Sequence, residues 1–217
     1  MLSIRRINKN KVCDGLRTAQ IFSFISGKNH QFARIIYTNG KMSDIIPTGD
    51  FMKNIILIGM PGAGKSTIGV LLAKSMLMDF VDTDLLIQKK YSTSLCEIIN
   101  SKGIEEFLKI ENDVISSWSF LNCVVATGGS VVYGEEAMGR LKKDGIAVYL
   151  RLMPEEIEKR INNIHTRGIA MKEGTSIADL YRERAPLYEK YADFTVDCRG
   201  LTAEQCVDKI IEMIENK

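Results

Sequence analysis

The chain has 217 residues, of which 45% are hydrophobic and 26% charged, and its formal net charge is +2. These values are typical of a globular protein and exclude a wholly disordered or fibrous chain. Apolar runs such as residues 55–58 are too short to cross a bilayer as a helix. The small net charge gives no support for nucleic-acid binding.

Residues 1–50 account for the chain's excess of positive charge, because they hold eight of the 29 Lys and Arg residues but three of the 27 Asp and Glu residues. They show no sustained period of 2 or 3.6, so we expect residues 1–51 to be a basic extension outside the fold. Three interpretations stay open: a transit peptide, a disordered extension, or a translation start at Met42 or Met52. No chemistry is assigned here.

From residue 52 to residue 217 strands and helices alternate, which defines the folded domain. Continuous apolar runs predict buried strands at 54–58, 80–81, 122–127, 146–152 and 194–196. Helical spacing and end signals predict helices at 65–78, from 95, and at 104–120, 135–143, 154–160, 176–191 and 203–215. This order predicts an α/β fold, a five-stranded parallel sheet with helices on both faces. Ligands of such sheets bind beyond the carboxyl ends of the strands.

Residues 59–66 read Gly-Met-Pro-Gly-Ala-Gly-Lys-Ser and match the phosphate-loop pattern G-x-x-x-x-G-K-S between a strand and a helix. Glycines let backbone N–H groups turn towards a phosphate, and the following helix adds the positive end of its dipole. Lys65 can reach the outer phosphates, and the Ser66 hydroxyl suits Mg²⁺. The candidate nucleotide contacts are Gly62, Ala63, Gly64, Lys65, Ser66 and Thr67.

Asp82-Thr83-Asp84 follows the second expected strand. Two carboxylates two positions apart at a strand end point to opposite sides, so one can approach Mg²⁺ while the other faces a different ligand. The alternative is an ordinary Asp-rich turn that caps a helix. No Asn-Lys-x-Asp occurs, which argues against a GTPase.

Segment 54–216 resembles the shikimate kinase family, of the nucleoside monophosphate kinase fold group, over about three quarters of the chain. The motifs occur in family order: residues 59–66, 82–84, 103–111, 127–129, Arg160, Arg167 and 184–188. The resemblance implies a P-loop kinase with a mobile lid. It also implies transfer of the γ-phosphate of MgATP to a hydroxyl of a small carboxylate metabolite, first of all shikimate, which gives shikimate 3-phosphate.

The resemblance assigns Asp82 to a place near Mg²⁺, beside Ser66, and Asp84 to the acceptor hydroxyl. A carboxylate within hydrogen-bond reach can orient an alcohol and take its proton. Gly128 and Gly129 are implied to cradle the acceptor through backbone N–H groups. Ser130 stands where the family has a third glycine, and it restricts the backbone there.

Three arginines complete the site that the resemblance implies. Arg167 matches the lid arginine that neutralises the transferring phosphate, so the expected catalytic residues are Lys65, Asp84 and Arg167. Arg160 matches the residue that stacks on adenine. Arg184 matches the residue that pairs with the acceptor's carboxylate.

Leu108 departs from the family pattern, because shikimate kinases have a second carboxylate-binding arginine there. Lys109 is rotated by about 100° on a helix and cannot simply replace it; we expect it to pair with Glu105. The run Glu-Phe-Leu also resembles the kinase-like domain of threonine synthase-like proteins, which makes homoserine or another hydroxy acid an alternative acceptor. The homoserine ammonium would then pair with Glu111 or Asp84.

Two further alternatives are a non-catalytic ATP-binding module and a nucleoside monophosphate kinase. The second is disfavoured because residues 84–130 contain no arginine to bind an acceptor phosphate. Five cysteines without Cys-x-x-Cys spacing indicate reduced thiols. We therefore expect a cytoplasmic monomer with a small-molecule substrate and no nucleic-acid or membrane partner, or an organelle protein if residues 1–50 are a transit peptide.

Overall fold

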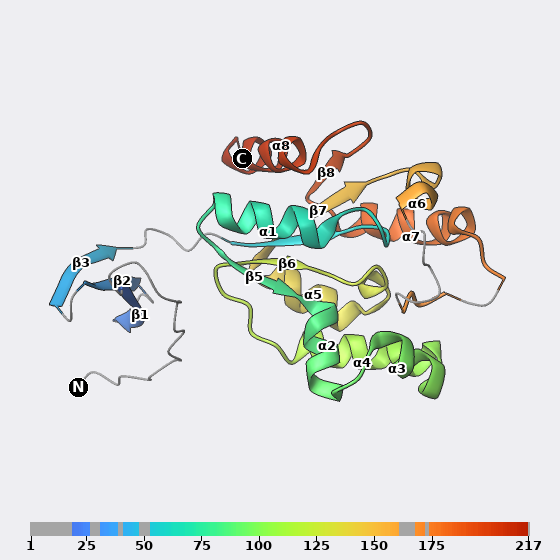
Figure 1. The fold of residues 1–217 in the computed structure, drawn as a ribbon, viewed down its shortest axis with the longest axis horizontal. Helices are drawn as coiled ribbons and strands as arrows, with labels where there is room; N and C mark the ends of the chain where they lie inside the picture. Colours follow the sequence, from blue (N-terminus) through green and yellow to red (C-terminus); the bar gives the residue numbers. More distant parts are fainter. Residues whose placement is uncertain are drawn as a thin grey trace. The chain divides into compact units, whose positions relative to one another are not determined.

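The computed structural model describes residues 19–26, 31–38, 41–47 and 53–216, apart from 161–167 and 172–173. The chain divides into two compact units, Met1–Met52 and Lys53–Lys217 (Figure 1). No helix in these described ranges is long and apolar enough to cross a bilayer.

The first unit contains an antiparallel sheet of β1 (Ala19–Ser26), β2 (Gln31–Thr38) and β3 (Lys41–Pro47), in that order. No strand was predicted within residues 1–51, so the structure adds these three strands to the sequence prediction. Strict alternation is absent from them, but β-branched and aromatic residues are frequent. The sequence between β2 and β3 is Asn-Gly, the pair that most favours a two-residue hairpin. The three interpretations of this extension stay predictions.

The second unit contains the five predicted strands, all parallel. They are β4 (Asn54–Ile58), β5 (Asp79–Asp82), β6 (Cys123–Ala126), β7 (Gly145–Arg151) and β8 (Phe194–Asp197). Their order is β5-β6-β4-β7-β8, which places the strand before the phosphate loop at the centre. Every residue from Ile55 to Ile58 is at most 1% exposed. A strand buried on both faces explains its continuous apolar sequence.

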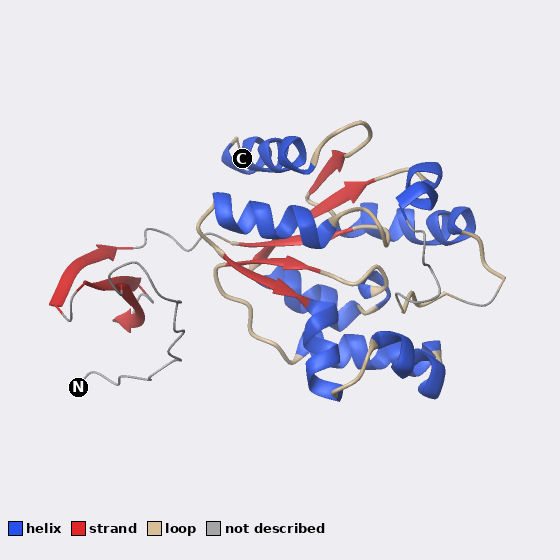
Figure 2. Ribbon diagram, viewed as in Figure 1, coloured by secondary structure: helices blue, strands red, loops and turns tan. Residues whose placement is uncertain are grey.

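Helices cover the sheet on both faces, as Figure 2 shows, and this confirms the predicted α/β fold. They are α1 (Lys65–Ser75), α2 (Thr83–Tyr91), α3 (Leu95–Lys102), α4 (Ile104–Ser116), α5 (Glu135–Lys143), α6 (Pro154–Arg160), α7 (Ile177–Tyr191) and α8 (Ala203–Glu215), with the 3₁₀ turn η1 (Val131–Tyr133). Helices α1 and α8 pack together on one face, whereas α5 packs on β4 and β7 from the other.

Helix α2 was not predicted, because Asp82-Thr83-Asp84 was assigned to the end of a strand. The Asp82 side chain accepts hydrogen bonds from the backbone N–H groups of Asp84 and Leu85, so it caps this helix. Asp82 and Asp84 do face different neighbours, but the start of a helix and not strand alternation separates them. Two predicted helices are also too long, since α1 ends at Ser75 and α4 at Ser116.

Candidate active site

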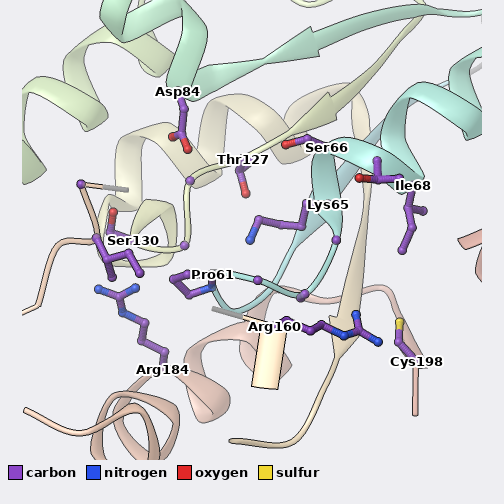
Figure 3. A pocket seen from close by; sticks show the side chains of 18 of the residues that line it. Pro61, Lys65, Ser66, Ile68, Asp84, Thr127, Ser130, Arg160, Arg184 and Cys198 are labelled. Atoms are coloured by element: carbon purple, nitrogen blue, oxygen red, sulfur yellow. The ribbon is translucent and has the colours of Figure 1, made fainter. Parts of the chain in front are cut away.

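A cavity of about 620 Å³ lies beyond the carboxyl ends of β4, β5 and β6. Figure 3 shows Asp84 and Arg184 at one end of it and Arg160 and Cys198 at the other, with Lys65 between them. The predicted site residues that line it are Gly62, Ala63, Gly64, Lys65, Ser66, Thr67, Asp84, Gly128, Gly129, Arg160 and Arg184. Arg167 and the first part of the predicted lid lie outside the described residues.

The phosphate loop turns through glycines with positive φ, +80° at Gly62 and +93° at Gly64, where other L-residues are strained. Lys65 Nζ donates to the carbonyl oxygens of Gly59 at 2.7 Å and Met60 at 2.8 Å. Burial lowers the pKa of Lys65 to about 8, and the negative charge of Asp84 opposes that shift. The ion pairs of the described residues do not include Lys65. A buried cation beside turned-in amides fits a phosphate group.

Ser66 and Asp82 form the candidate magnesium site. The Ser66 hydroxyl donates to Asp82 Oδ2 at 2.7 Å, while Asp82 Oδ1 caps α2 through the N–H of Asp84 at 3.0 Å. Hydroxyl and carboxylate oxygens suit Mg²⁺, which takes its other ligands from water and substrate phosphates. The described residues contain no group of three or more His, Cys, Asp or Glu that could hold a metal alone. The donor set therefore fits Mg²⁺ bound together with a nucleotide.

Asp84 and Glu111 converge on Gly128 at the other end of the cavity. A Cβ on Gly128 would lie 2.3 Å from Glu111 Oε1 and 2.8 Å from Asp84 Oδ1. Burial raises the pKa of Asp84 to about 6, with the Asp82 charge acting in the same direction and Lys65 against it. Burial also raises the pKa of Glu111, which is 2% exposed, to about 7. The sequence assigned Glu111 a role only for a homoserine acceptor.

Gly128 does not present a free N–H to an acceptor, which corrects one predicted role. Its N–H donates to the Thr83 hydroxyl at 3.0 Å, and Thr83 is fully buried at the start of α2. Gly128 instead provides the space in which the two carboxyl groups meet. Sequence analysis could not foresee this bond, because Thr83 and Gly128 are 45 residues apart.

Replacing Gly128 with alanine should lower kcat/KM for the acceptor about tenfold or more. The added methyl group would push the carboxyl groups of Asp84 and Glu111 out of place, and small displacements of reacting groups strongly reduce the rate. The melting temperature should change little, since the displaced atoms are the terminal oxygens of side chains and not backbone atoms. The matched control is Gly139→Ala, where an added Cβ has no neighbour within 4 Å. Steady-state kinetics and a thermal melt of each variant test this, and wild-type kinetics in Gly128→Ala would contradict it.

Arg184 is 1% exposed and is held by neighbours from two other segments. Its Nε donates to the Tyr133 hydroxyl at 3.1 Å, its Nη2 donates to the carbonyl oxygen of Ala170, and its guanidinium lies 5.2 Å from the Tyr133 ring centroid. The Tyr133 hydroxyl donates to Glu183 Oε1 at 2.7 Å. The remaining Nη1 lies at Gly129, 3.2 Å from a Cβ placed there. A fixed guanidinium edge in a cavity suits a carboxylate.

The other predicted residues lie as follows. Arg160 is exposed at the end of α6, on the side of the cavity that Cys198 and Thr202 line. Leu108 packs against the apolar cluster around Phe107 and is not among the residues lining the cavity. The predicted pairing of Lys109 with Glu105 is wrong, because Lys109 Nζ lies 3.4 Å from Glu106 Oε2, one turn earlier at i−3.

This site is that of a small-molecule kinase of the P-loop class. A phosphate loop follows the central strand, and carboxyl groups and an arginine lie across the same cavity. The sequence model of the family described as shikimate kinase matches residues 61–215. The shikimate kinase of Thermodesulfovibrio yellowstonii is 41% identical over 167 residues, which are 76% of this chain and 96% of that protein. The chain therefore belongs to the shikimate kinase family, as its motifs predicted, and kinases of this family use ATP with Mg²⁺.

Solved structures agree with this assignment. The shikimate kinase from Acinetobacter baumannii in complex with shikimate has a TM-score of 0.70 and 30% identity, and the match covers 76% of this chain and 94% of that chain. A deoxyadenosine kinase from M. mycoides has a TM-score of 0.55 at 14% identity, with 74% and 98% covered, and shows the shared fold alone.

Proposed function

We propose that this protein transfers the γ-phosphate of MgATP to a hydroxyl group of shikimate and gives shikimate 3-phosphate. The observation that carries the proposal is that one cavity joins the phosphate loop to Asp84 and Arg184. An acceptor held by Arg184 would then lie between the phosphate loop and Asp84, as phosphoryl transfer requires. The shikimate complex of the Acinetobacter baumannii enzyme supports the choice of acceptor.

Each residue has a definite task in this proposal. Residues 62–67 bind the phosphates, and Ser66 and Asp82 hold Mg²⁺, which neutralises phosphate charge when bound. Asp84 orients the acceptor hydroxyl and takes its proton as the new bond forms. Arg184 pairs with the acceptor carboxylate through its Nη1 edge. Gly129 has no side chain, so the acceptor can lie close to its backbone, and Arg160 contacts the adenine.

Arg167 neutralises the transferring phosphate in this proposal, as the lid arginine. The described residues just after it support that place. Gly168 has φ +64°, and a Cβ there would lie 2.7 Å from both the Leu95 Cβ and the Cys96 nitrogen. Ala170 accepts a hydrogen bond from Arg184. The chain following Arg167 is thus held at the acceptor end of the cavity.

We also propose a cytoplasmic monomer. The cavity contains both the phosphate loop and the acceptor residues Asp84 and Arg184, so the proposed reaction requires no residue from a second copy. Cys123, Cys198 and Cys206 form no disulfide among the described residues, as in proteins of reducing compartments. Light scattering during size-exclusion chromatography measures the molecular mass, and a dimer mass at micromolar concentration would contradict the proposal.

A screen of ATP consumption by the full chain tests the function directly. Shikimate, homoserine and nucleoside monophosphates are each added with MgATP, and the product is identified by mass. We expect turnover with shikimate far above that with the other acceptors. Turnover with homoserine or a nucleoside monophosphate alone would replace the proposed acceptor, and ATP binding without any phosphorylated acceptor would indicate a non-catalytic module.

Replacing Arg184 with lysine should raise KM for shikimate about tenfold or more and leave KM for ATP near the wild-type value, because lysine keeps the charge but loses the planar fork. The matched control is Arg182→Lys, since Arg182 lies on the same helix, is exposed and pairs with Asp179 at 2.5 Å. Steady-state kinetics with each substrate varied gives the result. A change confined to KM for ATP would place the carboxylate elsewhere.

A further inference from the structure

Glu111 is the carboxyl group that the proposed mechanism does not use. It lies on α4, is 2% exposed and lines the cavity. Its Oε1 has no hydrogen-bond partner in the described residues, although it lies beside Gly128 where Asp84 also points. A buried carboxyl oxygen without a partner costs free energy, and an arriving ligand can supply that partner.

The charged neighbours of Glu111 leave it without an ion pair. Asp84 on α2 repels its charge, whereas Lys65 and Arg184 attract it. Neither cation forms an ion pair with it among the described residues, since Lys65 bonds to the loop carbonyls and Arg184 to Ala170 and Tyr133. On α4 itself, Lys109 is exposed and pairs with Glu106, and Leu108 packs in the apolar cluster. The cavity side of α4 therefore presents a carboxyl group that lacks a counter-charge.

The polar groups nearest to Glu111 do not offset the free-energy cost of burying its charged form. The Ser130 hydroxyl offsets part of the cost of burial, but burial remains the larger effect and raises the pKa of Glu111 to about 7. The Tyr188 hydroxyl, which donates to the carbonyl oxygen of Gly129 at 2.5 Å, stays neutral because burial raises its pKa as well. Phosphates bound in the loop would add negative charge and favour the neutral form of Glu111 further.

We propose that Glu111 carries a proton in the working site and donates it in a hydrogen bond to an oxygen of the acceptor, next to the hydroxyl that Asp84 holds. The inference rests on the proposed function, because it concerns the same acceptor. Oε1, as the O–H, then has the partner that it lacks in the described structure. The acceptor binds at this end through one cation, Arg184, and one neutral acid, and its affinity falls when Glu111 ionises.

The test compares wild type with Glu111→Gln, which keeps an N–H donor at this place and cannot ionise. KM for shikimate is measured at saturating MgATP between pH 6.5 and 8.0. For wild type, KM should rise about five- to tenfold over this range, as the loss of a single proton predicts. For Glu111→Gln, KM should change less than about twofold, because the donor persists. Lys65 and Asp84 also titrate near this range, but both are present in the two proteins, so the difference between the two pH profiles reports Glu111.

A second variant and a second measurement complete the test. Glu111→Leu removes the donor and should raise KM for shikimate about tenfold already at pH 6.5, with KM for ATP unchanged. The infrared spectrum of the ligand-free protein should contain a protonated carboxyl band at pH 6.5 that weakens by pH 8.0, and the part of this band due to Glu111 should be missing in Glu111→Gln, where only the contribution of Asp84 remains. Equal pH dependence in wild type and Glu111→Gln, or no such band, would overturn the inference. Absence of shikimate turnover would instead overturn the proposed function. The infrared measurement needs no substrate, so it tests the protonation of Glu111 in either case.

Discussion

Replacing Asp84 with asparagine should lower kcat by a factor of about 10²–10⁴, the range that general acid–base catalysis contributes. The amide preserves the shape of the side chain but cannot take a proton from the acceptor hydroxyl. Asp84 lines the cavity beside Gly128 and lies outside the phosphate loop. KM for MgATP should therefore stay near the wild-type value, and steady-state kinetics measures both constants.

The matched control for this prediction is Asp113→Asn, because Asp113 is an exposed carboxyl group on α4, away from the cavity. It should leave kcat unchanged. If Asp84→Asn retains more than about a tenth of the wild-type kcat, its loss is smaller than acid–base catalysis provides. The acceptor proton would then leave by another route, directly to the phosphate oxygens or to water.

Replacing Lys65 with alanine should lower kcat/KM for ATP by a factor of about 10² or more, as loss of a transition-state charge contact does. The ammonium group is the buried cation of the loop and donates to two carbonyl oxygens, those of Gly59 and Met60. Loss of these bonds should also lower stability by about 1–3 kcal/mol, because two buried acceptors lose their donor. Steady-state kinetics with ATP varied and denaturant unfolding measure the two effects.

Lys74→Ala is the control for Lys65→Ala, since Lys74 is exposed in the last turn of the same helix. Its nucleotide affinity and activity should match those of wild type. Unchanged phosphoryl transfer in Lys65→Ala would show that the loop binds nucleotide without this charge, and it would remove Lys65 from the catalytic residues.

The sequence was most informative where a pattern is local. The five strands, the phosphate loop and the start of α3, where Ser94 and Glu97 form a capping box, depend on residues a few positions apart, and the structure contains all of them. The first sheet shows the limit of this approach. Its strands lack strict alternation, so a search for a period of 2 failed although residue composition and the Asn-Gly pair indicated a hairpin.

The contacts within the site depend on residues far apart in the chain, and no periodicity predicts them. The bond from Gly128 to Thr83 spans 45 residues, and the bond from Arg184 to Tyr133 spans 51. Tyr133 carries no motif, so sequence reasoning missed it. The sequence also could not predict that Glu111 Oε1 lacks a hydrogen-bond partner among the described residues, because this depends on the packing of α4 beside Gly128.

In the proposed function the Arg184 guanidinium both binds the acceptor carboxylate and donates a hydrogen bond to the carbonyl oxygen of Ala170. Ala170 lies three residues after Arg167, and its carbonyl oxygen satisfies an N–H of a side chain that is 1% exposed. If the segment 168–171 moved away, a buried donor would lose its acceptor, at a cost of about 1–3 kcal/mol. If Arg184 binds the acceptor carboxylate as proposed, the position of segment 168–171 and the affinity for the acceptor are thermodynamically linked. A substitution that loosens this segment should then weaken acceptor binding although it does not contact the acceptor.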